Sequence, residues 1–402
     1  MTFTLDPDRL ARITPWAQAY VDNRKFAGVS VLVAQHGQEV FFEAFGARDI
    51  EAGTPFERST VARIYSMTKP ITSLVFMMLL EEGRVHLNMP LSDVLPQFAE
   101  PNALVHAATR IDQTEPCPVP TLHQLLTHRS GFSYPFNPGV LPAAMGKQDL
   151  MFKPHGPSLT AQCAALARLP LAFSPGARWE YSVGIDVIGR VIEVVTGQPL
   201  DVVFAQRVFD PLGMSDTAFR VPDHARDRFA ALYTPLAGDA MDLGSGDVGA
   251  DTLRCVDKAT ASPFLDPTCL SGGGGLVGTL DDYMRFAECM RQGGQGLVSR
   301  SIADFMMSNH LPGDIASLGP ASFAELPMHG VGFGVGGAVN LDPARSSIPG
   351  SVADFSWGGM ASTFFWIDRV HEISAILFTQ LSPSSSYPAR AELKALVHGA
   401  LM

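Results

Sequence analysis

Apolar residues recur along the chain either with the spacing of a helix or with that of a strand, and the two spacings predict where the helices and strands lie. Residues 5–23 have the spacing of an amphipathic helix, whereas Val29–Ala34 and Glu39–Phe45 are apolar and β-rich around the turn His36-Gly37. Towards the other end, apolar stretches separated by turn residues predict strands over 331–341, 352–357, 361–367 and 373–380, and then a helix over 388–401. Strands at both ends predict one antiparallel sheet built from the two termini.

The middle of the chain is mainly helical. A helix is predicted from Ser66 to Glu82, where Gly83 ends it, and others over 121–127, 158–169, 183–196, 200–208 and 279–292. The rest of 97–160, and all of 220–268, show little periodicity, which predicts long loops. We therefore expect an α+β fold: residues 1–85 and 270–402 form an α/β domain, residues 86–269 form a mostly helical domain, and a site lies between them.

Composition narrows the possible partners. The net charge of -11 argues against a nucleic-acid surface, and no apolar run is long enough to span a membrane. Neither a basic leader nor an apolar leader segment opens the sequence, so we expect a cytoplasmic protein. Five widely spaced cysteines predict reduced thiols, and the eleven histidines show no metal-binding motif, so neither metal nor cofactor is expected. The oligomeric state stays open.

The first motif that carries chemistry is S-x-x-K at Ser66 and Lys69, just before an apolar helix. Residues three apart share one helix face, so the lysine amine lies within reach of the serine hydroxyl. A serine needs a neighbouring base to act as a nucleophile, and unpaired N–H groups at a helix start can hold an oxyanion. The alternative is a capping serine followed by a solvated lysine.

Two further segments could join this pair. Tyr181 follows a Pro-Gly turn at the mouth of a helix, where a phenol beside a lysine can take a proton, although a half-buried packing role is the alternative. Trp357-Gly358-Gly359-Met360 links two predicted strands, and its glycines allow a ligand or another backbone to approach. A free N–H there could complete an oxyanion hole with that of Ser66, unless the segment is only a hairpin turn.

Together, S-x-x-K at Ser66, Y-S at Tyr181 and W-G-G at Trp357 resemble the serine β-lactamase and penicillin-binding-protein superfamily, in its class C-like branch. The W-G-G variant is similar to the family VIII carboxylesterases. Supporting resemblances are the L-L-T-H-x-S-G stretch at 125–131, Pro-Leu-Gly-Met at 211–214 and Gly-Gly-Gly-Leu at 273–276. A complete G-x-S-x-G elbow is absent, and the nearest pattern, around Ser215, fails at its last position.

The resemblance implies a β-lactamase/DD-peptidase-like fold and a role for each site residue. Ser66 is the implied nucleophile, and Lys69 and Tyr181 are the implied base pair. Backbone amides of Ser66 and Met360 form the implied oxyanion hole. Trp357, Gly358, Gly359 and Val183 are the expected substrate-binding residues, with the indole lining the acyl pocket.

Two departures from the class C pattern bear on the substrate. Val183 stands where those β-lactamases have an asparagine, and Trp357 where they have a lysine that helps to hold the substrate carboxylate. We therefore expect a serine hydrolase that cleaves short to medium carboxylic esters through an acyl-enzyme. The alternatives are a class C-like β-lactamase, a D-amino-acid peptidase or amidase, an acyltransferase, and a non-catalytic binding module of the same fold.

Overall fold

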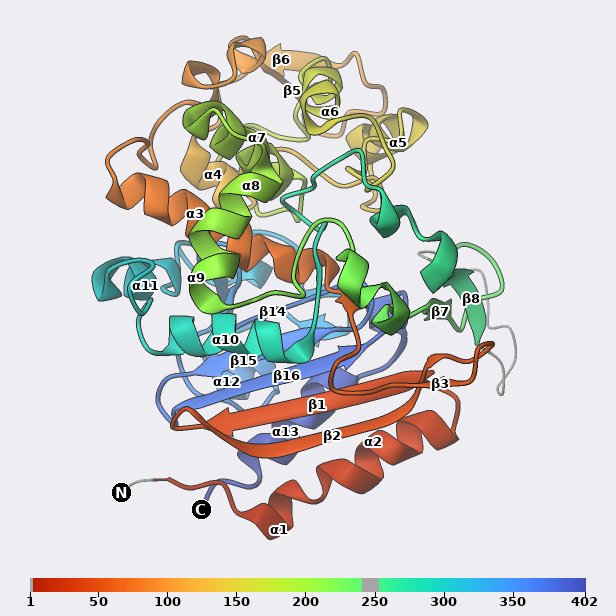
Figure 1. The fold of residues 1–402 in the computed structure, drawn as a ribbon. Coiled ribbons are helices and arrows are strands. Elements are labelled where there is room, and N and C mark those ends of the chain that lie inside the picture. The colour runs from red at the N-terminus through yellow and green to blue at the C-terminus, as the bar shows by residue number, and fades with distance from the viewer. Residues whose placement is uncertain (1–2, 241–252) are drawn as a thin grey trace.

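An eight-stranded antiparallel sheet forms the lower part of the computed structural model, which describes residues 3–240 and 253–402 (Figure 1). Strands from both ends of the chain meet in this sheet, as the sequence predicted. In order across the sheet they are β12 (Val331–Phe333), β13 (Ala338–Asn340), β14 (Phe355–Gly358), β15 (Phe364–Asp368), β16 (Ile373–Thr379), β1 (Gly28–Gln35), β2 (Gln38–Asp49) and β3 (Thr54–Pro55). The α+β prediction is confirmed.

Each face of the sheet packs against its own hydrophobic core. Along β1, Val31 and Val33 join the outer core, whereas Leu32 joins the inner one, as the two-residue period of a strand requires. The helices against the sheet are α1 (Pro7–Leu10), α2 (Ile13–Asp22) and α13 (Ala389–His398) on the outer face, and α10 (Leu280–Arg291) on the inner face (Figure 1).

Helix α3 (Thr68–Glu81) lies between the inner face of the sheet and the helical region, and every residue from Thr68 to Leu79 is buried. A helix that is buried on all sides packs against neighbouring elements on every face, and these neighbours fix its position. Beyond it lie α4 (Leu122–Leu126), α5 (Val140–Lys147), α6 (Leu159–Leu166), α7 (Gly184–Thr196), α8 (Leu200–Phe204) and α9 (Asp210–Leu212). The N-terminus of α3 is therefore a fixed point at which both halves of the fold meet.

Several short elements connect these layers. Four two-stranded pairs occur among the described residues: β4 (Ala62–Arg63) with β9 (Val277–Gly278), β5 (Asn102–Leu104) with β6 (Thr114–Pro116), β7 (Leu232–Thr234) with β8 (Arg254–Asp257), and β10 (Ser322–Phe323) with β11 (Leu326–Pro327). Two short helices are α11 (Arg300–Met306) and α12 (Pro343–Ser346). The β4–β9 pair leads directly into the turn before α3.

Three sequence predictions were wrong in detail. The helix expected over 5–23 is divided into α1 and α2, because Pro15 has no N–H to donate to the carbonyl of Ala11. The strand expected over 331–341 is a hairpin of β12 and β13, where the N–H of Gly334 donates to the carbonyl of Gly337 at 2.8 Å. The helix expected over 200–208 is present, but its second half, Ala205–Phe209, is π-helical and leads directly into α9.

Two regions that were expected to be loops also contain regular structure. Helix α5 forms within 97–160, and the β7–β8 pair forms within 220–268, although residues 241–252 of that loop lie outside the described part of the chain. Both elements are short and lack a strong period, so tertiary packing determines them.

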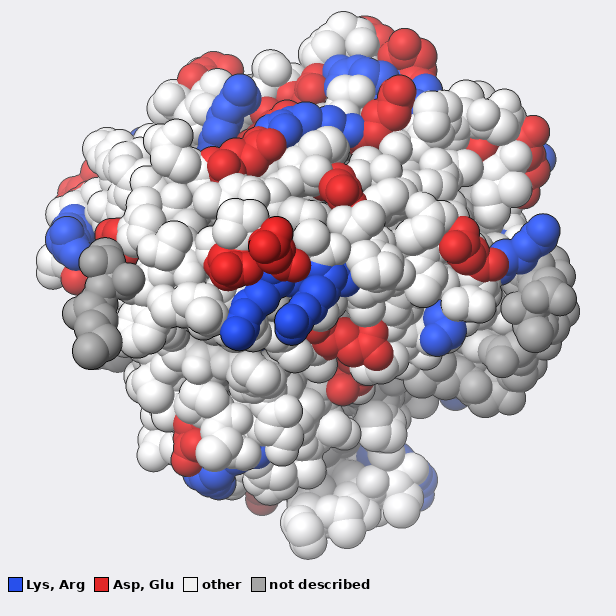
Figure 2. Space-filling view, turned by 90° about the horizontal axis from the view of Figure 1, so that it is seen from below, with Lys and Arg blue, Asp and Glu red and all other residues white. Residues whose placement is uncertain are grey.

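Other whole-chain expectations can be compared with the structure. Within the described residues, no helix is long and apolar enough to cross a membrane. All five cysteines are free. On the face seen in Figure 2, acidic and basic side chains lie in small mixed groups on a largely uncharged surface. The cytoplasmic location and the domain boundaries remain predictions.

Candidate active site

Ser66 lies in a tight 3-10 turn, Tyr65–Met67, immediately before α3. The residue before it, Tyr65, has a φ of 42°, a left-handed conformation that a bulky side chain adopts only when its surroundings enforce it. The packing of α3 on all sides supplies that constraint. The turn places the hydroxyl of Ser66 in the wall of a cavity instead of leaving it as an ordinary helix cap.

Two side chains approach the Ser66 hydroxyl, as the motif predicted. The phenol oxygen of Tyr181 lies 2.7 Å from Ser66 Oγ, and Lys69 Nζ lies 3.3 Å from it. Lys69 is fully buried and also donates to the Tyr134 hydroxyl at 3.0 Å and the Gly273 carbonyl at 2.6 Å. Each of the three protons of an ammonium group therefore has an oxygen to bind, which fixes the direction of the lysine.

Tyr134 and Asp186 complete this network, and neither was predicted from sequence. The Tyr134 hydroxyl donates to Asp186 Oδ2 at 3.1 Å, and the other carboxylate oxygen accepts from the Ser271 hydroxyl and from the Gly273 N–H at 2.9 Å. Burial raises the pKa of Tyr134 well above its usual value, so this phenol remains neutral and positions Lys69. A single acid among the buried apolar residues of α7 was the only sequence signal for Asp186.

The segment after β14 reaches the same point from the sheet. A Cβ on Gly359 would lie 2.3 Å from the carbonyl oxygen of Ile64, so only glycine allows this strand end to contact the turn that carries Ser66. The next residue, Met360, lines the same cavity as Ser66, and its N–H has no hydrogen-bond acceptor among the described residues. This free amide and Ser66 therefore line the same cavity, and the role of the amide in an oxyanion hole stays a prediction.

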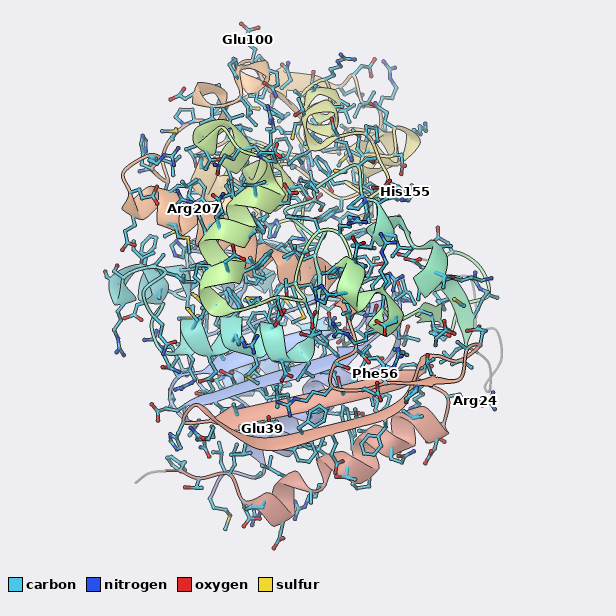
Figure 3. The ribbon with its side chains drawn as sticks, viewed as in Figure 1. Arg24, Glu39, Phe56, Glu100, His155 and Arg207 are labelled. Carbon is cyan, nitrogen blue, oxygen red and sulfur yellow. The ribbon has the colours of Figure 1, made fainter. Side chains whose placement is uncertain are left out.

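The cavity in front of Ser66 has a volume of about 460 Å³. Much of its wall is apolar, with Phe136, Met151, Phe152, Phe264 and Phe323 among the lining residues. Figure 3 labels His155, which belongs to the loop before α6 and borders the same cavity. Gly358 and Gly359 also line it, as expected of substrate-binding residues.

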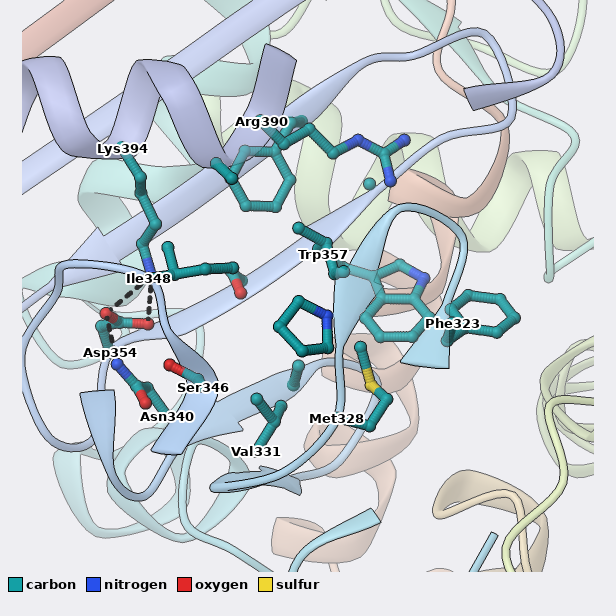
Figure 4. Close-up of a pocket in the computed structure, with 17 residues that line it drawn as sticks. Phe323, Met328, Val331, Asn340, Ser346, Ile348, Asp354, Trp357, Arg390 and Lys394 are labelled. Carbon is teal, nitrogen blue, oxygen red and sulfur yellow. Dashed lines mark hydrogen bonds and ion pairs between the residues drawn. The ribbon is translucent and has the colours of Figure 1, made fainter. Parts of the chain in front are cut away.

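The structure does not place Val183 and Trp357 in this wall. Val183 is fully buried as the residue before α7. Trp357 lines a separate cavity of about 70 Å³ behind the β10–β11 pair (Figure 4). Its indole packs against Tyr181 and Phe323, with ring centroids 5.4 and 5.8 Å apart. The expectation that Trp357 lines the acyl pocket is therefore corrected: β14 turns the indole toward the back of Tyr181.

His128 supports Tyr181 from another side. Its ring lies 4.7 Å from the Tyr181 ring, and its Nδ1 accepts the N–H of Ser182 at 3.2 Å. Complete burial lowers the pKa of His128 well below its usual value, so the imidazole is neutral. This histidine is part of the L-L-T-H-x-S-G stretch, so that stretch contacts Tyr181 through its histidine.

Arg390 of α13 binds the segment after β14 that contains Gly359. Its guanidinium donates to the carbonyl of Gly359 at 2.7 Å and to that of Thr363 at 3.2 Å, and it lies 3.2 Å from Glu325. Both charged side chains are only 7% exposed, and burial raises the pKa of Glu325. Arg390 was not predicted, because nothing in its local sequence marks it.

The fold and the Ser66–Lys69–Tyr181 constellation are those of a serine hydrolase of the β-lactamase type. The β-lactamase family model matches residues 13–399, so the chain belongs to the β-lactamase family.

Named relatives refine this assignment. Esterase EstB of Burkholderia gladioli is 32% identical over 389 residues, which cover 94% of this chain and 92% of that protein. Lovastatin esterase of Penicillium rubens is 29% identical, with 89% of this chain and 90% of that protein covered. The solved structure of EstCE1, described as a hydrolase with promiscuous acyltransferase activity, superposes with a TM-score of 0.78 at 28% identity, covering 98% of this chain and 99% of that one. The predicted esterase branch of the superfamily is confirmed, and the chain is a carboxylesterase-type serine hydrolase.

Proposed function

We propose that the enzyme hydrolyses neutral carboxylic esters with short to medium acyl groups through an acyl-enzyme on Ser66. The observation that carries this proposal is the position of Ser66 Oγ, between Tyr181 and Lys69 and at the wall of a largely apolar cavity. A nucleophile, its base and an oxyanion site within hydrogen-bond reach are what acyl transfer needs.

In the first half-reaction, Ser66 Oγ bonds to the ester carbonyl carbon and the hydroxyl proton passes to the Tyr181–Lys69 pair. The amides of Ser66 and Met360 hold the oxyanion, and the pair then returns the proton to the alkoxide as the ester C–O bond breaks. In the second half-reaction, water attacks the acyl carbon and gives its proton to the same pair. That proton returns to Ser66 Oγ as the acid leaves, and the enzyme is restored.

The surroundings of the cavity favour an uncharged substrate. Among the described residues that line the cavity, one lysine, Lys153, and one arginine, Arg390, carry a positive charge. Lys153 is bound to Asp149 at 2.7 Å, and Arg390 is buried against two backbone carbonyls. Both cations therefore already have partners in this structure, which disfavours the binding of a β-lactam carboxylate. The aromatic wall can instead bury an acyl chain, at up to about 0.8 kcal/mol per methylene.

A panel of p-nitrophenyl esters of rising chain length, assayed beside a chromogenic cephalosporin, tests this specificity. We expect kcat/KM to rise with chain length, pass a maximum and then fall, with weak or absent cephalosporin turnover. A cephalosporin kcat/KM equal to that of the best ester would replace this proposal with the β-lactamase alternative.

Trapping tests the intermediate independently of specificity. Treatment with an aryl organophosphonate and mass spectrometry of the digested protein should place the adduct on the peptide that contains Ser66. Since a phosphonate reacts only with an activated serine, an adduct at Ser130 or Ser215 instead would reject Ser66 as the nucleophile.

Acyl transfer to an alcohol is the second candidate, and the similarity to EstCE1 favours it. Its first half-reaction is the same, and an alcohol replaces water in the second. Adding a primary alcohol to the ester assay should divert part of the acyl group into a new ester, which chromatography detects. An unchanged yield of free acid at high alcohol concentration would exclude this activity.

A further inference from the structure

A second cluster of chemically active side chains lies at the opposite end of β15 from the active site. Asp368 ends β15, His371 lies in the turn to β16, and His398 is the last residue of α13. The ligating atoms of these three side chains all lie within 4.8 Å of one another. In the active-site direction, Phe364 at the other end of β15 pairs with Gly358, so the two sites are separated by the length of this strand.

Hydrogen bonds hold the first two members in place. His371 Nδ1 lies 2.8 Å from Asp368 Oδ2, and the Ser351 hydroxyl donates to the same carboxylate oxygen at 2.6 Å. The other oxygen, Oδ1, accepts the backbone N–H groups of Val370 and His371 at 2.9 and 3.1 Å. The Asp368 side chain is fully buried. The contacts from Ser351 and from the two backbone N–H groups orient the Asp368 carboxylate, as outer contacts orient the ligands in metal sites.

A catalytic triad is not the explanation for this cluster. Ser351 and Asp368 both bond to Nδ1 of His371, at 2.8 Å each. In a triad the serine and the aspartate bond to opposite ring nitrogens, so that a proton can move from one side of the imidazole to the other. Here Ser351, Asp368 and Nδ1 of His371 meet at one point, where a cation can replace the proton that Nδ1 shares with the carboxylate.

His398, the third member of the cluster, has a ring nitrogen that is unpaired within the described part of the chain. Its Nε2 is buried and has no hydrogen-bond partner among the described residues. A buried polar nitrogen left without a partner costs free energy, so a missing partner is expected there. The neighbouring cation, Lys394, does not fill the need, because its ammonium is bound by both oxygens of Asp354 at 2.8 and 2.9 Å (Figure 4).

We propose that Asp368, His371 and His398 bind one divalent transition-metal ion of the zinc type. Two imidazole nitrogens and one carboxylate oxygen are a ligand set that Zn²⁺ prefers, and a water or the Ser351 hydroxyl can occupy a fourth position. Tetrahedral bonds of about 2.0 Å place ligand atoms about 3.3 Å apart, so modest side-chain shifts suffice. The ion joins the C-terminal end of α13 to the β15–β16 turn and acts in stability, not in ester chemistry.

The sequence alone predicted no metal, and the reason is the spacing. Asp368 and His371 are three residues apart, but His398 comes from a helix much further along the chain. Only the packing of α13 on the outer face of the sheet brings the third ligand to the other two.

Zinc titration of the chelator-treated, full-length protein tests the proposal. We expect one Zn²⁺ per chain by calorimetry, a rise in the thermal midpoint on adding zinc, and tetrahedral d–d absorption bands when Co²⁺ is used. Asp368→Asn and His398→Gln should each weaken zinc affinity at least tenfold. His398→Gln is the more informative variant, because Nε2 makes no bond on which the fold depends.

His310→Gln is the matched control. His310 Nδ1 lies 3.0 Å from His123 Nε2, so that pair is the other place where imidazoles could share an ion. The proposal requires the control to bind zinc like the wild-type protein. It is overturned if the wild type binds no stoichiometric zinc, if His398→Gln binds as tightly as the wild type, or if His310→Gln removes the binding.

Discussion

At the scale of single residues, the site is organised around the amine of Lys69. Its three acceptors come from the turn before α3, from the segment after α4 and from the glycine-rich loop before β9. An ammonium at this position has an oxygen acceptor for each of its three protons, so the lysine cannot rotate away from Ser66 without losing hydrogen bonds to the Tyr134 hydroxyl and the Gly273 carbonyl. Tyr181, which contacts Ser66 more closely, depends on this fixed neighbour.

We expect Lys69 and Tyr181 to act as one unit. Lys69→Ala, Tyr181→Phe and the double variant should each lose about the same activity, several orders of magnitude in kcat, because groups that move one proton together are not additive. Steady-state kinetics on the best p-nitrophenyl ester measure this. A double variant whose loss equals the product of the single losses would show that the two residues act independently.

Tyr134 is predicted to be a positioning residue. Tyr134→Phe removes the hydroxyl between Lys69 and Asp186, and a hydrogen bond to a charged group is worth about 1.5–3 kcal/mol. We therefore expect kcat to fall roughly 10- to 100-fold with little change in KM. Tyr20→Phe is the control, since its hydroxyl bonds to Glu392 on the outer face of the sheet. A wild-type kcat in the Tyr134→Phe variant would show that Tyr134 does not position Lys69.

Sequence patterns were sufficient to predict that Ser66, Lys69 and Tyr181 converge, because each lies in a short local motif. They were insufficient for Tyr134, whose role depends on a contact with Asp186, 52 residues away. They also misplaced Trp357: the motif identified the residue but not which side of β14 its indole occupies. Local spacing predicts what a residue can do, whereas the fold decides which group it meets.

At the scale of elements, the proposed oxyanion hole depends on the contact between the Ser66 turn and the end of β14. Ile64 and Gly359 approach so closely that any side chain at Gly359 would push the two elements apart. Ser66 belongs to the first of these two elements and Met360 to the second. The contact between Ile64 and Gly359 therefore sets the distance between the amides of Ser66 and Met360.

Gly359→Ala is expected to lower kcat about 10²- to 10³-fold, the usual loss for one misplaced oxyanion donor. The added methyl group would also meet Thr363 Oγ1 at 2.3 Å, so a small local shift cannot relieve it. Gly146→Ala on α5 is the control, because its nearest neighbour is 3.9 Å away. Circular dichroism should show that both variants fold. Equal activities of the two variants would contradict this role.

Elements with strong local signals were predicted most accurately. Thr121 and Thr279 cap α4 and α10 as their sequences indicate, and His36 and Gly37, both with positive φ, turn β1 into β2. The β12–β13 hairpin was mistaken for one strand because its apolar run continues through the turn. The conformation of the glycines decides whether the chain turns at this place, and apolar periodicity does not report glycine conformation.

At the scale of the whole molecule, a buried histidine makes stability depend on pH. Burial and the neighbouring His310 lower the pKa of His123 to about 4. In the unfolded chain an imidazole titrates near 6.5. Below that value the unfolded state binds more protons than the folded state, so the contribution of His123 to stability is lost as the pH falls from about 6.5 towards 4.

His123→Gln should reduce this acid sensitivity. Between pH 7.5 and pH 5.5, the wild-type protein should lose about 1 kcal/mol more unfolding free energy than the variant, because glutamine takes up no proton. Urea denaturation at the two pH values measures the difference. Acids whose pKa is raised by burial, such as Asp186, act in the opposite direction, but they are the same in both proteins. Equal losses would show that His123 is not kept neutral by the fold.

The pairing of β1 with β16 sets an order of events during synthesis. Val29 pairs with Thr379, so at about 5–20 residues per second one edge of β1 waits roughly 20–70 s for its partner to emerge from the ribosome. During that time the β1–β2 hairpin offers unpaired N–H and C=O groups to any passing strand. Ser66 is made early and the Met360 segment late, so the proposed nucleophile meets its proposed oxyanion donor only when synthesis is nearly complete.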